Sequence, residues 1–298
     1  MGPTPPRVER ARLPAASSVL PKRGAKPKST RAPRRDGDPA PPVPHLFDDL
    51  PQLTGRLRSA TRLALLLDLD GTVVPLRSRP AQVVMDSRTQ QALAQLSRLP
   101  KVGLWVISGR RLADLRRIVG LQEVKCLGLH GWEDRSGRDL SASTARRMRQ
   151  ARSMFEGSLA GLPGVWIEHK GPIFVVHHRG APVDSVRRAR RIVRELMKEF
   201  QATLRLMPGK KIWEILPSEF PRKGDAAAAI AALQPPGSVL IYIGDDVTDE
   251  SAFRALPGAI TVRVGRPART TARFRLRSPV EVLQFLQIIV TAVGRPSP

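Results

Sequence analysis

Cysteine, aromatic residues and acidic residues are all scarce in this sequence. Cys126 is the single cysteine among 298 residues, which excludes an intramolecular disulfide and a zinc site built from several cysteines. The apolar residues around it predict a short buried strand at 124–128, so we interpret Cys126 as a packing residue and not as a nucleophile. Acidic residues number 26 against 50 lysines and arginines, which gives a formal net charge of +24.

Long apolar runs are also missing. No run reaches the roughly 18 residues that a membrane-spanning helix needs, and the first residues lack the apolar core of a signal peptide. We therefore expect no membrane partner, a cytoplasmic location and a monomer. The charge of +24 suits a polyanion. Aromatic residues make up only 4% of the chain, however, and without an RNA-binding aromatic signature or zinc-finger spacing the sequence argues against a nucleic-acid partner.

Residues 1–45 differ in composition from the rest of the chain. They hold eleven of the 28 prolines and ten lysines and arginines, but only three acidic residues. Such a segment cannot bury enough apolar surface to offset the entropy lost on ordering, so we predict a disordered tail over 1–45. A basic tail that touches polyanions is the functional alternative, and a solvated extension is the simpler one.

A run of apolar residues that ends in two carboxylates is the most informative stretch of the sequence. Leu63–Leu67 predicts a strand buried on both faces, and Asp68, Asp70 and Gly71-Thr72 follow it. Side chains two positions apart on a strand share a face, so both carboxylates can address the crevice where ligands bind in open α/β sheets. Two like charges so close need a cation, and oxygen ligands favour Mg²⁺. Two solvated acids at a turn are the alternative.

A second predicted strand ends in residues suited to an anion. The strand at 102–107 is followed by Ser108, Gly109 and Arg110. A small hydroxyl and the backbone N–H groups at the start of a helix can point at one phosphate oxygen. The same three residues also suit an ordinary helix cap, so alone they indicate little.

Acidic and basic groups gather again in the last third of the chain. A predicted buried strand at 239–244 delivers four acidic residues within 245–250, a cluster that is hard to explain without a cation. Lys223 stands near the start of an alanine-rich helix at 226–233, where its ammonium can screen Asp68 and hold a phosphate. A surface lysine would be better placed at the other end of the helix dipole.

The residues from 135 to 216 change in pattern and predict a separate unit. We predict a cap domain with an antiparallel sheet at 135–216, inserted into a core domain at 46–134 and 217–298. The elements predicted for the cap follow the order αββαββ: a helix at 143–159, strands at 165–170 and 173–179, a helix at 183–200, and strands at 202–207 and 211–216 that turn at Pro208-Gly209. The core adds helices near 50–61 and 83–99, capped by Asp49 and Asp86, a last strand at 259–264 and a last helix at 279–293.

Together these segments resemble the motifs of the haloacid dehalogenase (HAD) superfamily of phosphatases, in the superfamily's order: Asp68-x-Asp70-Gly71-Thr72, Ser108, Lys223 and Gly244-Asp245-Asp246. More narrowly, Gly244–Glu250 is similar to the G-D-D-x-T-D-E signature of trehalose-6-phosphate phosphatases. Three segments of the predicted cap resemble that family's E-x-K, V-H-Y-R and G-K-x-x-x-E patterns, namely Glu168-x-Lys170, Val176–Arg179 and Gly209–Glu214. The resemblance implies an α/β fold: a Rossmann-like HAD core with a parallel sheet, plus the inserted αββαββ cap.

The resemblance also implies roles for particular residues. It makes Asp68 the nucleophile and Asp70 the general acid/base, and it gives Mg²⁺ the ligands Asp68, Asp70 (through its backbone carbonyl) and Asp245. The phosphate-binding residues that it implies are Thr72, Ser108, Gly109 and Lys223. The sugar-binding residues are Arg110, Glu168, Lys170, His177, Arg179, Lys210 and Glu214. Alternation along the strands, 168 with 170 and 177 with 179, aims these side chains together, which suits a sugar with pairs of hydroxyls.

Three residues depart from the family's pattern. Val73, Trp132 and His178 stand where Leu, a small residue and an aromatic such as Tyr are usual, and the last two bear on the sugar pocket. The implied reaction is the hydrolysis of a small-molecule substrate, trehalose 6-phosphate, to trehalose and phosphate through an aspartyl-phosphate. Two alternatives stay open: a phosphatase for another sugar phosphate, of the sucrose or mannosyl-glycerate type, and a non-catalytic protein that binds polyanions through its positive charge.

Overall fold

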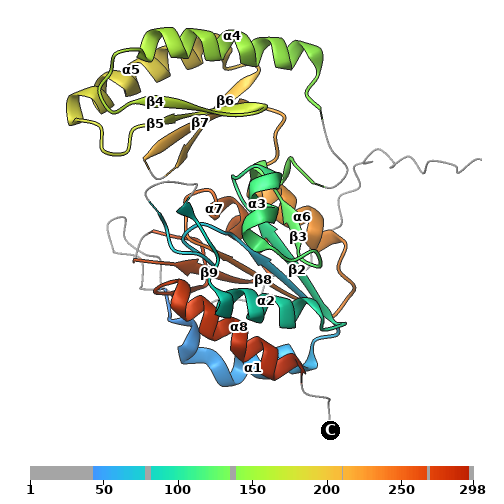
Figure 1. Ribbon diagram of the computed structural model, residues 1–298. Helices are drawn as coiled ribbons and strands as arrows, with labels where there is room; N and C mark the ends of the chain where they lie inside the picture. Colours follow the sequence, from blue (N-terminus) through green and yellow to red (C-terminus); the bar gives the residue numbers. More distant parts are fainter. Residues whose placement is uncertain (1–42, 78–81, 135–138, 210, 267–268, 295–298) are drawn as a thin grey trace, which may run out of the picture. The chain divides into compact units, whose positions relative to one another are not determined.

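A computed structural model of the chain describes residues 43–77, 82–134, 139–209, 211–266 and 269–294. Most of the predicted tail, residues 1–42, lies outside these ranges. The described residues form a six-stranded parallel sheet and a four-stranded antiparallel sheet (Figure 1). The predicted fold class is therefore confirmed. Among the described residues, no helix is long and apolar enough to cross a membrane.

The six-stranded sheet has the strand order β10-β9-β8-β1-β2-β3. Its strands are β1 (Leu63–Leu67), β2 (Val102–Ile107), β3 (Lys125–Leu127), β8 (Val239–Gly244), β9 (Ile260–Val264) and β10 (Phe274–Leu276). All five residues of β1 are buried. A strand in the middle of a parallel sheet has helices over both faces, which explains why its sequence is apolar throughout instead of alternating.

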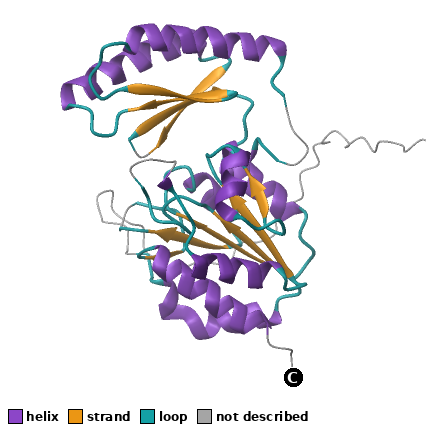
Figure 2. Cartoon of the chain, in the orientation of Figure 1, coloured by secondary structure: helices purple, strands orange, loops and turns teal. Residues whose placement is uncertain are grey.

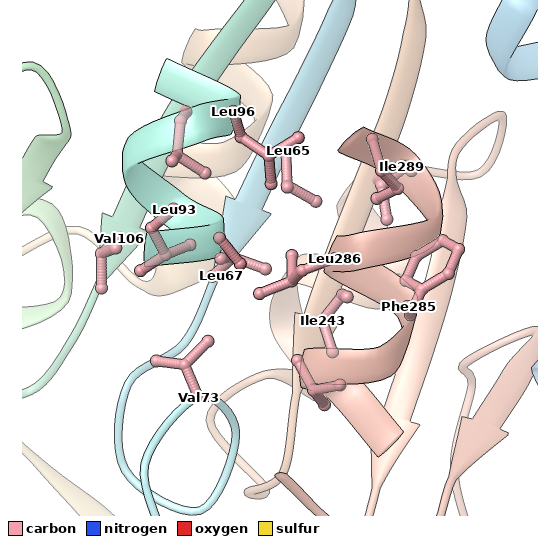
Figure 3. Close-up of a cluster of buried hydrophobic side chains, with 14 of the residues drawn as sticks. Leu65, Leu67, Val73, Leu93, Leu96, Val106, Ile243, Phe285, Leu286 and Ile289 are labelled. Carbon is pink, nitrogen blue, oxygen red and sulfur yellow. The ribbon is translucent and has the colours of Figure 1, made fainter. Parts of the chain in front are cut away.

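The side chains of β1 alternate between two hydrophobic cores, one on each face of the sheet. Leu65 and Leu67 belong to the larger core and Ala64 and Leu66 to the smaller one. Helices of the larger core are α1 (Leu50–Ser59), α2 (Ser87–Ser97), α3 (Leu112–Val119) and α8 (Pro279–Gly294), and those of the smaller core are α6 (Lys223–Ala232) and α7 (Glu250–Ala255). Figure 3 shows Leu65 and Leu67 beside the side chains of α2 and α8. Cys126 is buried in the larger core, as a packing residue should be.

The four-stranded sheet has the order β4-β5-β7-β6, and two long helices cover one of its faces (Figure 2). In chain order the elements are α4 (Ala142–Leu159), β4 (Trp166–Lys170), β5 (Ile173–His177), α5 (Val183–Phe200), β6 (Leu204–Gly209) and β7 (Ile212–Pro217). This is the predicted αββαββ order. We call this part of the chain the four-stranded layer.

The predicted turn of the second hairpin was wrong. Pro208 and Gly209 are the last residues of β6, where they pair with Trp213 and Ile212. Proline lacks the N–H that a central strand must donate, but β6 is an edge strand and tolerates it. Pro208 and Gly209 therefore belong to the end of an edge strand and not to the turn of the hairpin.

Three further features of the larger sheet differ from the sequence predictions. Strand β10 and helix α7 were not predicted, because β10 has only three residues, without an apolar run, and α7 only six. Asp49 was predicted to cap the first helix, but its side chain makes no capping bond; a short 3₁₀ helix at Leu46–Asp49 precedes α1 instead. The cap predicted for α2 is confirmed, since Asp86 accepts the backbone N–H of Thr89 at 3.0 Å.

Residues 43–45, which the composition assigned to the tail, contact the folded chain. His45 is buried and forms a β-bridge with Arg275, and its Nε2 lies 2.8 Å from Oε2 of Glu281 in α8. Burial raises the pKa of the Glu281 carboxyl, but the backbone N–H of Arg277 and the His45 ring hold it below its usual value. The pair joins the start of the described chain to its last helix.

We expect His45→Ala to lower the free energy of unfolding by about 1–2 kcal/mol, because it leaves the partly buried Glu281 carboxylate without its ring partner. Urea denaturation at pH 7 measures this. The control is His169→Ala, whose ring makes an equally short bond to Glu156 but on an exposed surface; it should change stability by less than about 0.5 kcal/mol. Equal effects of the two substitutions would contradict a special role for His45.

Candidate active site

The carboxyl ends of three neighbouring strands bring the predicted phosphate-side residues together. Strands β8, β1 and β2 are adjacent in the sheet, and Asp245, Asp68 and Ser108 directly follow their last residues. A pocket at this edge also reaches the four-stranded layer. The predicted site residues that line it are Asp68, Asp70, Ser108, Gly109, Arg110, Glu168, Lys170, His177, Arg179, Glu214, Lys223 and Asp245. Thr72 is buried behind Asp68, to whose Oδ2 it donates at 3.2 Å, and Lys210 lies outside the described residues.

A buried lysine holds two carboxylates beside the pocket. The Lys223 ammonium donates to Oδ1 of Asp68 at 2.6 Å and to Oδ1 of Asp249 at 2.8 Å. Burial lowers the pKa of Lys223, but the carboxylates of Asp249 and Asp68 outweigh it and raise this pKa well above its usual value. Burial raises the pKa of Asp68; Lys223 opposes the shift, and Asp249 and Asp245 add to it. Lys223 is thus a fixed cation in a site where negative charge is in excess.

Three buried carboxylates lie close together beside the pocket. One oxygen from each of Asp68, Asp245 and Asp249 lies within 4.8 Å of the others. Three carboxylates beside the single ammonium of Lys223 leave two negative charges, which a divalent cation balances. Carboxylate oxygens are the donors that Mg²⁺ prefers. This cluster differs from the ligand set that the resemblance implied, which has the backbone carbonyl of Asp70 in place of Asp249. Asp68 and Asp245 belong to both sets, and their carboxylates are suitable ligands for Mg²⁺.

Asp249 is engaged by the protein itself. Its Oδ1 accepts from Lys223 and from the Tyr242 hydroxyl, the latter at 2.9 Å. Its Oδ2 accepts the backbone N–H groups of Asp245 at 3.0 Å and Asp246 at 2.9 Å. These four donors match the four acceptor sites of a carboxylate. Asp249 therefore shapes the loop that presents Asp245, a role that sequence reasoning missed.

Glycine is required directly after the second of the two carboxylates that follow β1. Gly71 has a φ of +84°, and a Cβ on it would collide with the carboxylate of Asp245. The backbone after β1 thus passes directly against the loop after β8, which is possible only without a side chain. The Gly of Asp-x-Asp-Gly-Thr is explained by this close approach.

Asp70 is held by an arginine on the neighbouring loop. Nε and Nη2 of Arg110 each donate to one oxygen of the Asp70 carboxylate, both at 2.7 Å. Burial lowers the pKa of Arg110, but the bonded Asp70 carboxylate reverses this and raises it. Arg110, predicted to bind sugar, also fixes Asp70 in the pocket wall.

Acidic and basic side chains alternate along the pocket wall, from the four-stranded layer to the loop after β3. The order is His177, Glu168, Lys170, Glu214 and His130, and the closest N–O distances between successive members are 2.7, 4.0, 3.5 and 2.7 Å. Burial opposes ionisation of Glu214, but His130 and Lys170 hold its pKa at about 2. Glu168 is likewise held below its usual pKa, since the bond from His177 outweighs burial. Both carboxylates are therefore ionised at neutral pH.

The two departures from the family pattern that bore on the pocket do not line it. Trp132 stacks on Phe220 with ring centroids 4.1 Å apart, and His178 stacks on Trp213 at 4.2 Å. All four are packing residues. The expectation that Trp132 and His178 alter the sugar pocket directly is therefore not supported by their positions.

Sequence reasoning missed several residues that line the pocket, and His130 is the buried histidine among them. It is buried, lines the pocket and bonds to Glu214. The available signal was its place in His130-Gly131-Trp132-Glu133, directly after the third predicted strand, where ligand-binding residues of α/β sheets are found.

A parallel sheet with two carboxylates after its central strand, interrupted by an αββαββ segment, places the chain in the HAD superfamily. The sequence model of the trehalose-phosphatase family matches residues 66–272. The chain belongs to the trehalose-phosphatase family.

The chain is also similar to individual proteins and to solved structures. The chain is 30% identical over 250 residues to the trehalose-6-phosphate phosphatase of Escherichia coli (strain K12), covering 81% of this chain and 91% of that protein. It is 35% identical over 248 residues to an uncharacterized glycosyl hydrolase of Mycobacterium tuberculosis, but spans only 18% of that protein's length. The C-terminal domain of C. albicans trehalose-6-phosphate phosphatase superposes with a TM-score of 0.73 at 25% identity, covering 85% of this chain and 99% of that one.

Proposed function

We propose that the protein hydrolyses trehalose 6-phosphate to trehalose and inorganic phosphate. The observation that carries the proposal is one pocket that suits both ends of such a substrate. Asp68, Asp70 and Lys223 line it on the phosphate side, and Glu168 and Glu214 line it on the sugar side. Membership of the trehalose-phosphatase family supports the proposal.

Asp68 is the proposed nucleophile. One of its oxygens bonds to phosphorus while the bond between phosphorus and the sugar oxygen breaks, which splits one difficult step into two easier ones. Asp70 enters this step as the protonated acid and gives its proton to the leaving sugar oxygen. It then takes a proton from the water that cleaves the aspartyl-phosphate. The oxygen of that water leaves in inorganic phosphate, and the Asp68 carboxylate is restored.

Groups around Asp68 stabilise the transferring phosphoryl group. Lys223, Ser108 and the backbone at Gly109 line the pocket beside the nucleophile and are the proposed phosphate contacts. Thr72 orients Asp68 through its hydroxyl. Asp68, Asp245 and the backbone carbonyl of Asp70 are the proposed Mg²⁺ ligands, and a bound Mg²⁺ supplies positive charge to the phosphoryl oxygens.

The four-stranded layer is the proposed sugar-binding part, in line with the cap domain predicted at 135–216. Carboxylates accept hydrogen bonds from pairs of hydroxyls, and Glu168 and Glu214 present ionised carboxylates to the same pocket. Lys170 and His177 hold these two acids in place. Arg179 supplies a further donor in the wall. A layer that covers the bound ester also limits attack by stray water.

Substrate identity is tested with a panel of phosphate esters in the presence of Mg²⁺. The panel contains trehalose 6-phosphate, sucrose 6-phosphate, a mannosyl-glycerate phosphate and p-nitrophenyl phosphate. We expect the highest kcat/KM for the trehalose ester. A clear preference for another sugar phosphate, or no preference among them, would overturn the proposed specificity.

Glu168→Gln should reduce kcat/KM for trehalose 6-phosphate by roughly ten- to hundredfold, because a hydroxyl loses a charged hydrogen-bond partner. Hydrolysis of p-nitrophenyl phosphate, which has no sugar hydroxyls, should change by less than about twofold, well below the loss expected for a charged hydrogen bond. Steady-state kinetics on both esters measure the split. Glu156→Gln is the matched control, since Glu156 also bonds to a histidine of β4 but on an exposed surface. A parallel loss on both esters would show that Glu168 supports the pocket as a whole.

A further inference from the structure

The loop after β3 has an unusual backbone. Leu129, His130 and Gly131 all have positive φ, at 45°, 62° and 110°. Two of these residues have a Cβ, for which the left-handed region is unfavourable. Such a conformation persists only where surrounding contacts hold it, and it is found most often at functional sites. Contacts with neighbouring residues must therefore hold the loop in this conformation.

Backbone hydrogen bonds fasten this loop to the predicted phosphate loop. The N–H of His130 donates to the carbonyl of Ser108 at 2.9 Å, and that of Leu129 donates to the carbonyl of Arg110 at 2.8 Å. The Glu133 carboxylate accepts the backbone N–H of Leu112 at 2.6 Å and Nε of Arg111 at 2.9 Å. Four hydrogen bonds thus join residues 129–133 to residues 108–112.

The side chain of His130 extends from the loop at 129–133 to the four-stranded layer. Its Nε2 lies 2.7 Å from Oε2 of Glu214 in β7. The two side chains are only 5% and 6% exposed, so the bond is made out of contact with bulk water. A Cβ on Gly109 would lie 2.8 Å from Cε1 of the ring, so the imidazole packs directly on the phosphate loop. Nδ1 is buried without a hydrogen-bond partner, which leaves Glu214 as the polar contact that fixes the ring.

We propose that His130 is a positioning residue that fixes the sugar-side carboxylate Glu214 relative to the phosphate loop at 108–110, and so sets the distance between the two ends of the substrate. The proposal rests on the proposed function. A substrate that fits both ends gains from this spacing, whereas an ester without a sugar does not. His130 itself does not contact the reacting atoms.

The alternative is that His130 only stabilises the turn, and two substitutions separate the roles. His130→Asn keeps the left-handed backbone, which Asn adopts readily, but its shorter side chain cannot reach Glu214. His130→Gln can place an amide N–H near the position of Nε2. We expect His130→Asn to be folded and to raise KM for trehalose 6-phosphate by roughly tenfold or more, the loss typical of a hydrogen bond to a charged group. Kinetics on p-nitrophenyl phosphate should stay within about twofold of wild type, and His130→Gln should restore most of the KM.

Three controls make the outcome decisive. His169→Asn, on an exposed histidine–carboxylate pair, should leave both esters unchanged. A cycle of His130→Asn, Glu214→Gln and the double variant, followed by urea unfolding, tests the coupling of the two side chains without any substrate. If the wild type prefers another sugar phosphate on the panel, the proposed function fails. The effect of His130→Asn on KM is then compared between that preferred ester and p-nitrophenyl phosphate. An unchanged KM for the sugar ester, a parallel loss on both esters, or additive effects in the cycle would each overturn the positioning role.

Discussion

Asp68→Asn should lower kcat for the sugar ester by at least about ten-thousandfold, because it removes the proposed nucleophile without changing the shape of the side chain. The fold should not suffer. Burial disfavours the ionised form of Asp68, so a neutral amide at this position leaves the melting temperature unchanged or raises it. Lys223 keeps its second partner, Asp249, in the variant. Loss of activity with retained stability is the expected result.

Kinetics and thermal unfolding of the same preparation check this prediction. Asp114→Asn is the control, because Asp114 is an exposed acid of α3 that forms an ion pair with Arg117 on the surface; it should change neither quantity. Activity near that of wild type would show that Asp68 is not the nucleophile. A fall in melting temperature of more than a few degrees would show that the carboxylate is structural.

Lys223→Met should lower the free energy of unfolding by about 3–5 kcal/mol, since removal of one partner leaves buried charge without compensation. The side chain is only 3% exposed and bonds to both Asp68 and Asp249. Hydrolysis of every ester should fall as well, because the proposed phosphate contact is lost. Lys198→Met, which removes an exposed pair with Glu195, should change stability by less than about 1 kcal/mol.

The pH dependence of the Lys223→Met effect has a definite sign. The pKa of Lys223 is raised in the folded state, so its stabilising effect is complete at pH 7 and is lost only at strongly alkaline pH. Acid protonates the carboxylates that Lys223 compensates, beginning with Asp68, whose pKa is raised. The deficit of the variant, measured by urea unfolding from pH 7 to pH 4, should therefore shrink. A deficit that grows in acid would contradict this charge balance.

Local patterns were enough to predict the elements that place the site. The apolar run of β1 and the similar runs of β2 and β8 predicted buried parallel strands, and their carboxyl ends then had to meet. Asp68, Ser108 and Asp245 followed from that rule. The boundaries of α5 and β8 agree with the predicted ranges, because long periodic or apolar segments have few alternatives.

What the sequence could not show depends on contacts between distant residues. Asp249 looks like one acid among four, and only its bonds to Lys223 and Tyr242 reveal its role. His130 becomes a site residue through Glu214, 84 positions away. Strand β10 exists because β9 pairs with it. Local signals also misled at Pro208-Gly209, where the order of the strands shows why proline is tolerated.

The stack of Trp132 on Phe220 has a consequence for the evolution of such proteins. The chain leaves the larger sheet near Trp132 and returns near Phe220, so the two ends of the intervening segment are held side by side. A segment whose ends are adjacent can be lengthened, shortened or exchanged without a change in the strand order of the six-stranded sheet. Substrate choice, which we propose depends on that segment, can therefore diverge while the carboxylates after β1 and β8 stay in place. Any replacement would have to rebuild a partner for His130.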